Sequence, residues 1–355
     1  MKDKILSLAK ELIAIPSVSE DTKYAVEILE IVKRELIAYP FTPFASEGIP
    51  SLLFTNKEDQ PKNFKIILNA HLDVIPGTPE QYKPFVKDGK LYGRGAFDTK
   101  AAAAAMILLF KELSQKLSYP LGLQLTTDEE SNGKYGTGYQ RQQGVTADFA
   151  ICAECNSNLR VTNEAKGRRI IKVSVKGHAA HSAYAWNGTN AILAMYTALD
   201  PIIKAYPSPK IETHLTTVNI TKIETANEAI NIIPDHCTAY VDVRFEKKDE
   251  ETIIPRLLSL LPKDAEIEIT PLHPAHATPA DHPYIVKIQS LVKEIHGEDL
   301  PLRLAHGTSD ATYFPLSIEF GPIGDGAHHD DEWVDINSLE EYYNILKQFL
   351  LSLNK

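Results

Sequence analysis

The sequence has little of what marks a secreted, membrane-spanning or nucleic-acid-binding protein. Only three of its 355 residues are cysteine, and such a sparse, odd set argues against a disulfide framework and favours a reducing compartment. Its longest apolar run, residues 101–110, is far shorter than the roughly 20 residues that a membrane-spanning helix needs. The first residues mix acidic and basic side chains in an amphipathic pattern, unlike a signal peptide. We therefore expect a soluble, cytoplasmic protein without a membrane partner.

The charge balance and the motifs that are missing exclude further classes. The net charge is −10, and no basic patch of the kind typical of nucleic-acid-binding proteins is visible. The sequence also lacks the glycine-rich dinucleotide motif, the P-loop and the GxSxG nucleophile motif. No nucleic-acid partner is expected, and part of the acidity is assigned to carboxylates that bind cations.

Short apolar runs alternate with helical spacing over much of the chain. The pattern predicts one or two helices within residues 5–32 and another over residues 101–117. Strands that alternate with helices indicate an α/β fold with a mostly parallel sheet. The strands of this sheet are predicted at residues 65–70, 121–127, 148–153 and 317–323.

The order of predicted strands and helices changes between residues 167 and 273, where it is βαββαβ. This order is typical of a small ferredoxin-like α+β unit. We therefore expect two domains, a discontinuous α/β domain of residues 1–166 and 274–355 and an inserted domain of residues 167–273. The elements of the inserted domain are predicted at residues 168–176, 189–205, 214–223, 238–245, 250–261 and 265–272.

Histidine and acidic residues follow the predicted strands of the α/β domain, at the sheet edge where ligands collect. Their nitrogen and oxygen donors suit Zn²⁺, Co²⁺ or Mn²⁺. Two histidines and three carboxylates exceed the needs of one tetrahedral ion and suit two ions that share a bridging carboxylate, while one further carboxylate is available as a proton shuttle. The residues are His71, Asp73, Asp98, Glu129, Glu130, Glu154 and the pair His328–His329.

Each of these groups also has a purely structural interpretation when it is taken alone. His71 with Asp73 can be a local ion pair at a strand end, and Asp98 can be the N-cap of the following helix. The pair Glu129–Glu130 can be a solvated turn. Asp98 precedes the predicted helix and the other residues follow predicted strands, so five separate segments bring these side chains to one edge of the sheet. Their common placement favours a metal centre.

The same residues lie in motifs that resemble the M20 metallopeptidase family. That family includes acetylornithine deacetylases, succinyl-diaminopimelate desuccinylases, aminoacylases and glutamate carboxypeptidases. The resemblance runs in order through nearly the whole chain and implies a zinc-peptidase-like catalytic domain with an inserted lid and dimerisation domain. The motifs are HLD at His71, GRGAFDTK at Asp98, TTDEE at Glu130, AE at Glu154, GHAAHSA at His181, NIIP at Asn231, GTSDA at Ser309 and AHHDDEWV at His328.

The resemblance implies a set of metal ligands and a catalytic base. Two divalent ions, zinc or else cobalt or manganese, are expected, with Asp98 bridging them. Glu129 matches the general base that activates the bridging water, and Asp73 matches the carboxylate that orients a ligating histidine. The implied ligands are His71, Asp98, Glu130, Glu154 and His328.

The resemblance also assigns residues outside the metal centre. His181 resembles the histidine that reaches the site of a partner subunit and stabilises the oxyanion, which implies a homodimer through the inserted domain. Asn231 and Arg244 resemble residues that hold the substrate or its carboxylate. The segment Gly307, Thr308 and Ser309 is either substrate-binding backbone or an ordinary loop.

The chain departs from the family pattern at a few positions. Ala101 stands where glycine is usual, and the loop after Glu130 is about one residue longer than common versions. The family also implies a cis peptide bond between Asp98 and Thr99. The motif Cys152–Cys155 is a formal CxxC pattern, but without a second pair or nearby histidines it is interpreted as two packing or lining thiols.

The expected reaction is hydrolysis of the amide bond of a small N-acyl amino acid, such as acetylornithine or succinyl-diaminopimelate. Glu154, where other branches have aspartate, resembles the deacylase and carboxypeptidase branches more than the aminopeptidase branch. A metallocarboxypeptidase or dipeptidase that acts on short peptides is the alternative. A non-catalytic metal-binding homologue, or an assembly whose inserted domain is chiefly an interaction platform, remains the hypothesis from another class.

Overall fold

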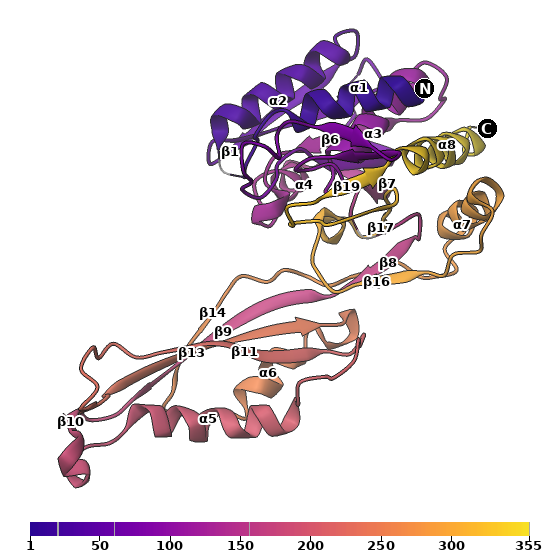
Figure 1. The fold of residues 1–355 in the computed structure, drawn as a ribbon. Helices are drawn as coiled ribbons and strands as arrows, with labels where there is room; N and C mark the ends of the chain where they lie inside the picture. Colours follow the sequence, from indigo (N-terminus) through magenta and orange to yellow (C-terminus); the bar gives the residue numbers. More distant parts are fainter. Residues whose placement is uncertain (20, 60, 156, 355) are drawn as a thin grey trace. The chain divides into compact units, whose positions relative to one another are not determined.

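The computed structural model describes residues 1–19, 21–59, 61–155 and 157–354. The chain divides into two compact units (Figure 1). The larger unit comprises Met1–Glu164, Ala277–Ala305 and Ser309–Lys355, and the smaller unit comprises Ala165–His276 together with His306–Thr308. The short segment 306–308, which the sequence-based boundaries assigned to the discontinuous domain, is therefore grouped with the smaller unit.

A mixed sheet with parallel central strands forms the framework of the larger unit. Among the described strands its order is β1-β2-β6-β3-β7-β17-β8-β15, and β16 pairs with β8. The neighbours β6, β3, β7 and β17 run parallel to one another. Strand β1 pairs antiparallel with β2, and β2 pairs antiparallel with β6. The predicted α/β fold with a mostly parallel sheet is confirmed. The strands are β1 (Phe41–Ser46), β2 (Ile49–Thr55), β3 (Asn63–His71), β6 (Leu121–Thr126), β7 (Thr146–Cys152), β8 (Thr162–Ala165), β15 (His276–Ala277), β16 (Arg303–Ala305) and β17 (Ser317–Glu319).

Helices cover this sheet, and one of them lies in the interior. Every residue from Lys100 to Phe110 of α3 is buried, as expected of a helix that is apolar on all sides. It packs against α1, α8 and β3 and ends at Leu113, earlier than predicted. In the described part of the chain, no helix is long and apolar enough to cross a bilayer. The helices are α1 (Lys2–Ile13), α2 (Thr22–Glu35), α3 (Lys100–Leu113), α4 (Thr137–Gln142), α7 (Pro283–His296) and α8 (Ile336–Ser352).

Side-chain alternation in the parallel strands separates the apolar core from a polar row. Successive residues of a strand point to opposite faces of the sheet. In β3, Leu68 joins the main core, whereas Asn69 on the other face donates a hydrogen bond to Gln124 of β6. The register continues by pairing His71 with Thr126. The carboxyl ends of β3 and β6 therefore present polar side chains next to one another.

The smaller unit has the predicted βαββαβ order. Its antiparallel sheet has the order β11-β13-β9-β14 among the described strands, and apolar side chains of the sheet and both helices form a separate core. A two-residue ribbon of β10 (Ala180–His181) and β12 (Ile232–Ile233) was not predicted. The main elements are β9 (Gly167–Lys176), α5 (Ala191–Ala205), β11 (Thr217–Glu224), β13 (His236–Phe245), α6 (Ile253–Leu258) and β14 (Glu266–Ile269).

A small antiparallel sheet in the larger unit joins two segments that are distant in the sequence. Strands β4 (Phe85–Lys87) and β5 (Lys90–Tyr92) pair with β19 (Trp333–Asp335), which also pairs with β18 (Gly324–Asp325). Strands of two or three residues are too short to produce a periodic pattern, so the sequence did not reveal them. Their pairing brings the segment before α3 beside the segment that carries His328.

Candidate metal centre

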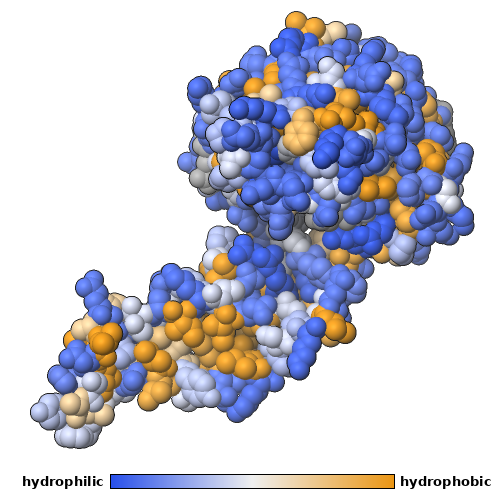
Figure 2. Space-filling model, viewed as in Figure 1, coloured by the Kyte–Doolittle hydropathy of each residue, from blue (hydrophilic) through white to orange (hydrophobic). Residues whose placement is uncertain are grey.

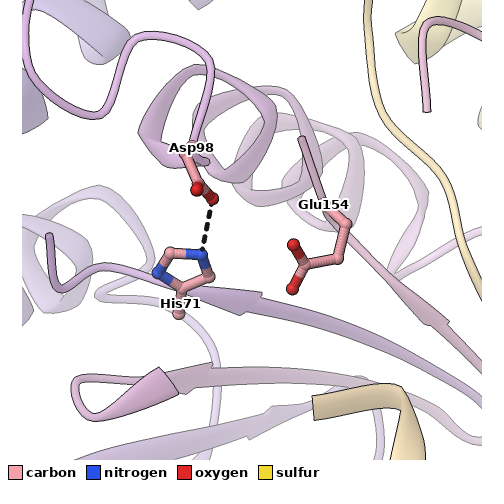
Figure 3. Close-up of side chains that lie close together, drawn as sticks. All are labelled: His71, Asp98 and Glu154. Atoms are coloured by element: carbon pink, nitrogen blue, oxygen red, sulfur yellow. Dashed lines mark hydrogen bonds and ion pairs between the residues drawn. The ribbon is translucent and has the colours of Figure 1, made fainter. Parts of the chain in front are cut away.

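Histidine and acidic side chains meet at the carboxyl ends of the parallel strands. His71 is the last residue of β3, Asp98 precedes α3, and Glu154 follows β7 (Figure 3). One ligating atom from each of these three residues lies within 4.8 Å of the others, and Asp98, Glu130 and His328 form a second such group. Asp98 therefore belongs to both groups.

The carboxylate of Asp98 contacts one histidine with each of its oxygens. Its Oδ1 lies 3.2 Å from Nε2 of His71, and its Oδ2 lies 3.3 Å from Nε2 of His328. Nε2 of His328 also lies 3.0 Å from Oε2 of Glu130. Two ligand atoms about 2.0–2.2 Å from a tetrahedral zinc ion are separated by roughly 3.3–3.6 Å. The donor types and their spacings therefore fit divalent cations.

The electrostatics of the cluster point to the same conclusion. Burial raises the pKa of Glu154 well above its usual range, and the charges of Glu129 and Asp98 raise it further. Burial likewise raises the pKa of Glu129; His71 opposes this, whereas nearby carboxylates add to it. Hydrogen bonds to Asp98 and Glu130 raise the pKa of His328 to about 10. Positive charge stabilises the ionised form of buried carboxylates this close together. Divalent metal ions supply such charge.

Asp73 connects His71 to the two adjacent glutamates. Its Oδ1 lies 3.4 Å from Nδ1 of His71, and its two oxygens accept hydrogen bonds from the backbone N–H groups of Glu129 and Glu130, each at 3.1 Å. Burial alone would raise the pKa of Asp73, but the hydrogen bond and charge of His71 lower it. An Nδ1 that donates to Asp73 leaves Nε2 of His71 as the atom that can bind a metal. The contacts to both glutamates were not predicted from the sequence.

The local pair of His71 with Asp73 is present, but the purely structural interpretations of Asp98 and of Glu129–Glu130 do not hold. The N-cap of α3 is Thr99, without a side-chain cap hydrogen bond, so Asp98 does not cap the helix. The Asp98–Thr99 peptide bond is cis, as the family resemblance implied. The side chains of Glu129 and Glu130 are 13% and 8% exposed, so the pair is not a solvated turn.

Two buried aspartates anchor the glycine-rich loop that follows Glu130. A Cβ at Gly133 would lie 2.1 Å from Oδ1 of Asp310, and a Cβ at Gly136 would lie 2.2 Å from Oδ1 of Asp128. Only glycine allows such a close approach. Asp310 lies in the GTSDA motif, but its hydrogen-bond partners were not predicted. It accepts hydrogen bonds from the buried side chains of Asn69, Thr126 and Thr137.

The structure brings His181 and Asn231 to the same ribbon of the smaller unit. His181 in β10 pairs with Ile232 in β12, and the N–H of Ser182 donates to the carbonyl oxygen of Asn231 at 2.9 Å. Both His181 and Asn231 are exposed. Nδ1 of His181 accepts a hydrogen bond from the N–H of Ala183 at 3.1 Å, which leaves Nε2 as the ring nitrogen available to donate.

Arg244 lines a pocket of about 250 Å³ within the smaller unit. Its Nε donates to Oδ1 of Asp242 at 2.8 Å. Lys166 and His306 also line the pocket, together with Glu212, whose carboxylate lies 3.0 Å from Nε2 of His306, and neutral residues. Arginine, with its fork of N–H donors, is suited to bind a carboxylate.

The remaining predicted segment has mixed surroundings. Gly307 is exposed and Thr308 is half-buried. Ser309 is buried, and its hydroxyl donates to Oε1 of Glu319 at 2.6 Å. The side chain of Ser309 is therefore engaged inside the larger unit.

The two formal CxxC cysteines border this region without forming a disulfide. Neither Cys152 nor Cys155 takes part in a disulfide. Cys152 is fully buried beside Asn69 in the sheet, and burial raises its pKa well above the usual range. Cys152 therefore has the packing role that the sequence predicted.

Comparison with known proteins assigns the family. A model of the peptidase family M20/M25/M40 matches residues 67–352. The succinyl-diaminopimelate desuccinylase of Paraburkholderia xenovorans is 26% identical over 98% of both chains. The enzyme of the same name from Wolinella succinogenes is 28% identical and covers 99% of this chain and 100% of its own.

Solved structures share the whole fold. Aminopeptidase PepT from Bacillus cereus has a TM-score of 0.82 at 18% identity, covering 100% of this chain and 99% of its own. The Bacillus subtilis protein YXEP, a dinuclear metal-binding peptidase of the M20 family, has a TM-score of 0.71 at 13% identity over 99% and 98% of the two chains. At these identities the likeness establishes the fold alone. The family match, which covers most of the chain, establishes that the protein belongs to the peptidase family M20/M25/M40 and is a metal-dependent hydrolase.

Proposed function

We propose that the protein hydrolyses the amide bond of a small N-acyl amino acid with the help of two divalent metal ions. The observation that carries this proposal is the carboxylate of Asp98, which directs one oxygen to each of two histidines. Nitrogen and oxygen donors favour zinc, with cobalt and manganese as alternatives. We assign His71, Asp98 and Glu154 to one ion and Asp98, Glu130 and His328 to the other.

In this proposal Glu129 moves the proton. When bound, the ions lower the pKa of a water molecule and stabilise negative charge on the scissile carbonyl oxygen. The carboxylate of Glu129 accepts a proton from the attacking water and passes it to the leaving amine. Its Oε2 lies 4.0 Å from Nε2 of His71, and its backbone N–H donates a hydrogen bond to Oδ1 of Asp73. These contacts support its role as the general base beside the ligands. We assign His181 to stabilise the substrate oxyanion.

The proposed substrate carries at least one carboxylate in addition to its amide bond. The side chains of Arg244 and Lys166 in one pocket support this choice. We assign Arg244 and Asn231, with the backbone of Gly307, Thr308 and Ser309, to substrate binding. The curated relatives are succinyl-diaminopimelate desuccinylases, so a succinylated or acetylated amino acid is the first candidate. Short peptides with a free carboxyl terminus are the alternative that a substrate panel would reveal.

A homodimer through the smaller unit is also proposed. The outer face of α5 exposes large apolar side chains, with Ile192, Leu193, Tyr196 and Ile203 between 45% and 67% exposed. Figure 2 shows apolar side chains gathered on the smaller unit in the region of this helix. In addition, β11 is an edge strand of its sheet among the described strands, and such edges pair readily with a second chain. A second copy of the chain would cover both features.

Substitution of the two adjacent glutamates separates catalysis from metal binding. We expect Glu129→Gln to lower kcat by about 10²- to 10⁴-fold, because the amide cannot accept the proton, while the bound metal content stays at the wild-type level. Glu130→Gln serves as the matched control and should lose both turnover and metal. Elemental analysis of the dialysed proteins, together with hydrolysis of N-acyl amino acids, measures both effects. A Glu129→Gln protein with wild-type turnover would contradict the assigned base.

Two arginines that share one aspartate test the carboxylate pocket. Nε of Arg168 and Nε of Arg244 both bond to Asp242, but of these two arginines the pocket lining includes Arg244. We expect Arg244→Gln to raise KM for a carboxylate substrate by roughly 10- to 100-fold, since hydrogen bonds to charged groups contribute about 1.5–3 kcal/mol. Arg168→Gln should leave KM near the wild-type value. If both substitutions raise KM equally, the effect would come from loss of the ion pair with Asp242 and not from loss of a contact with the substrate.

Mixing two inactive variants tests whether His181 acts in the partner subunit. His181→Ala and Glu129→Gln should each be inactive alone. After the two proteins are unfolded and refolded together, random pairing would leave roughly a quarter of the sites with both wild-type residues if His181 acts across a two-fold dimer. Activity recovered to that level, in a species of dimer mass by light scattering, is the expected result. No recovery in a mixed dimer would place His181 in its own subunit, and a monomer would contradict the dimer.

A further inference from the structure

Glu332 is a buried acid that none of the assigned roles uses. It is 2% exposed and lies in the AHHDDEWV motif, four residues after His328. Its carboxylate accepts four hydrogen bonds of 2.9–3.0 Å, two on each oxygen. The donors are Nη1 of Arg94 and the backbone N–H groups of Gly95, Phe97 and Asp98.

These four bonds fill the acceptor capacity of the carboxylate. An ionised carboxylate offers about four lone-pair positions on its two oxygens, and bonds to an ionised acceptor are roughly twice as strong as neutral ones. Arg94 also balances the charge of Glu332, with Nη1 2.9 Å from Oε2. Glu332 therefore differs from the metal ligands around Asp98, because its charge already has a partner and its oxygens point into the backbone of segment 94–98.

Glu332 connects the segments that carry two metal ligands. Its side chain binds the N–H of Asp98, and its own carbonyl oxygen accepts the N–H of Gly93 at 3.2 Å. On the other side it belongs to the segment of His328, whose φ of 67° lies in the left-handed region that few non-glycine residues adopt. Nε2 of His328 then lies 3.3 Å from Oδ2 of Asp98. Asp98 and His328 thus meet at their side chains, and the side chain of Glu332 links the segment after His328 to the backbone of Asp98.

We infer that Glu332 is a positioning residue that holds Asp98 and His328 in the geometry that binds the metal pair. The inference rests on the proposed function, since it assumes that these two residues ligate metal. Glu332 belongs to neither group of candidate ligands. It acts by fixing the backbone N–H of Asp98 and the segment after His328. Its loss should therefore weaken metal binding by Asp98, the ligand that both ions share, without altering the substrate site.

Glu332→Gln is the direct test. The amide keeps the size of the side chain but replaces one acceptor oxygen with an N–H₂ group that faces two N–H donors. We expect the dissociation constant for Zn²⁺, measured on metal-free protein by competition with a chromophoric chelator, to rise about 10- to 100-fold. We also expect kcat to recover with excess metal, while KM for substrate at saturating metal stays near the wild-type value.

Controls separate positioning from a general loss of stability. Leu346→Ala removes a fully buried core side chain of α8; it should lower Tm but leave the dissociation constant for Zn²⁺ unchanged. Glu332→Asp keeps the charge on a shorter side chain and should weaken Zn²⁺ binding less than Glu332→Gln. If Glu332→Gln does not fold, the same titration of Glu332→Asp decides the question.

The outcomes distinguish this inference from the proposed function. Wild-type protein that binds no Zn²⁺ would overturn the proposed function and this inference with it. Wild-type protein that binds two ions, with Glu332 variants that lose Tm but keep the wild-type affinity, would overturn this inference alone. A rise in KM at saturating metal without any change in metal affinity would also overturn it, because the effect would then lie at the substrate.

Discussion

The contact of one carboxylate with two imidazoles determines what this site can do. Asp98 lies between His71 and His328, with an oxygen 3.2–3.3 Å from each Nε2. Further carboxylates crowd this group, and burial makes their charge costly unless cations balance it. The proposed reaction needs a proton acceptor beside the metal ions. Glu129, the proposed acceptor, directly precedes Glu130, a proposed ligand. In the proposed reaction, metal binding and base catalysis would thus depend on the same local charge distribution.

The fold supports this arrangement by register and by buried hydrogen bonds. Parallel strands align their carboxyl ends, so His71, Thr126 and the residues after β7 emerge together. Beneath them, Asp73 and Asp310 accept hydrogen bonds from neighbouring segments and fix the loop of the two glutamates. Glu332 does the same for the segment of Asp98. The proposed ligands therefore lie beside acids that are themselves hydrogen-bonded or packed against glycine.

Much of the site could be predicted from the sequence because it depends on strand ends. Runs such as residues 65–70 are long enough to reveal buried strands, and the polar residues that follow them must then share an edge. The βαββαβ order of the smaller unit was likewise readable from periodicity. The acids that organise the site could not be found in this way: Asp310 and Glu332 bind backbone and side chains from distant segments, and no local pattern encodes such partners. The small sheet of β4, β5, β18 and β19 was not predicted because its strands are too short to produce a periodic pattern.

Anomalous diffraction from crystals of the protein grown with Zn²⁺, recorded at wavelengths on both sides of the zinc absorption edge, tests directly whether Asp98 bridges two ions. We expect two zinc peaks about 3.5–4 Å apart, with Asp98 bound to both, His71 and Glu154 bound to one, and Glu130 and His328 bound to the other. A single fully occupied ion, or two ions of which Asp98 touches only one, would contradict this expectation.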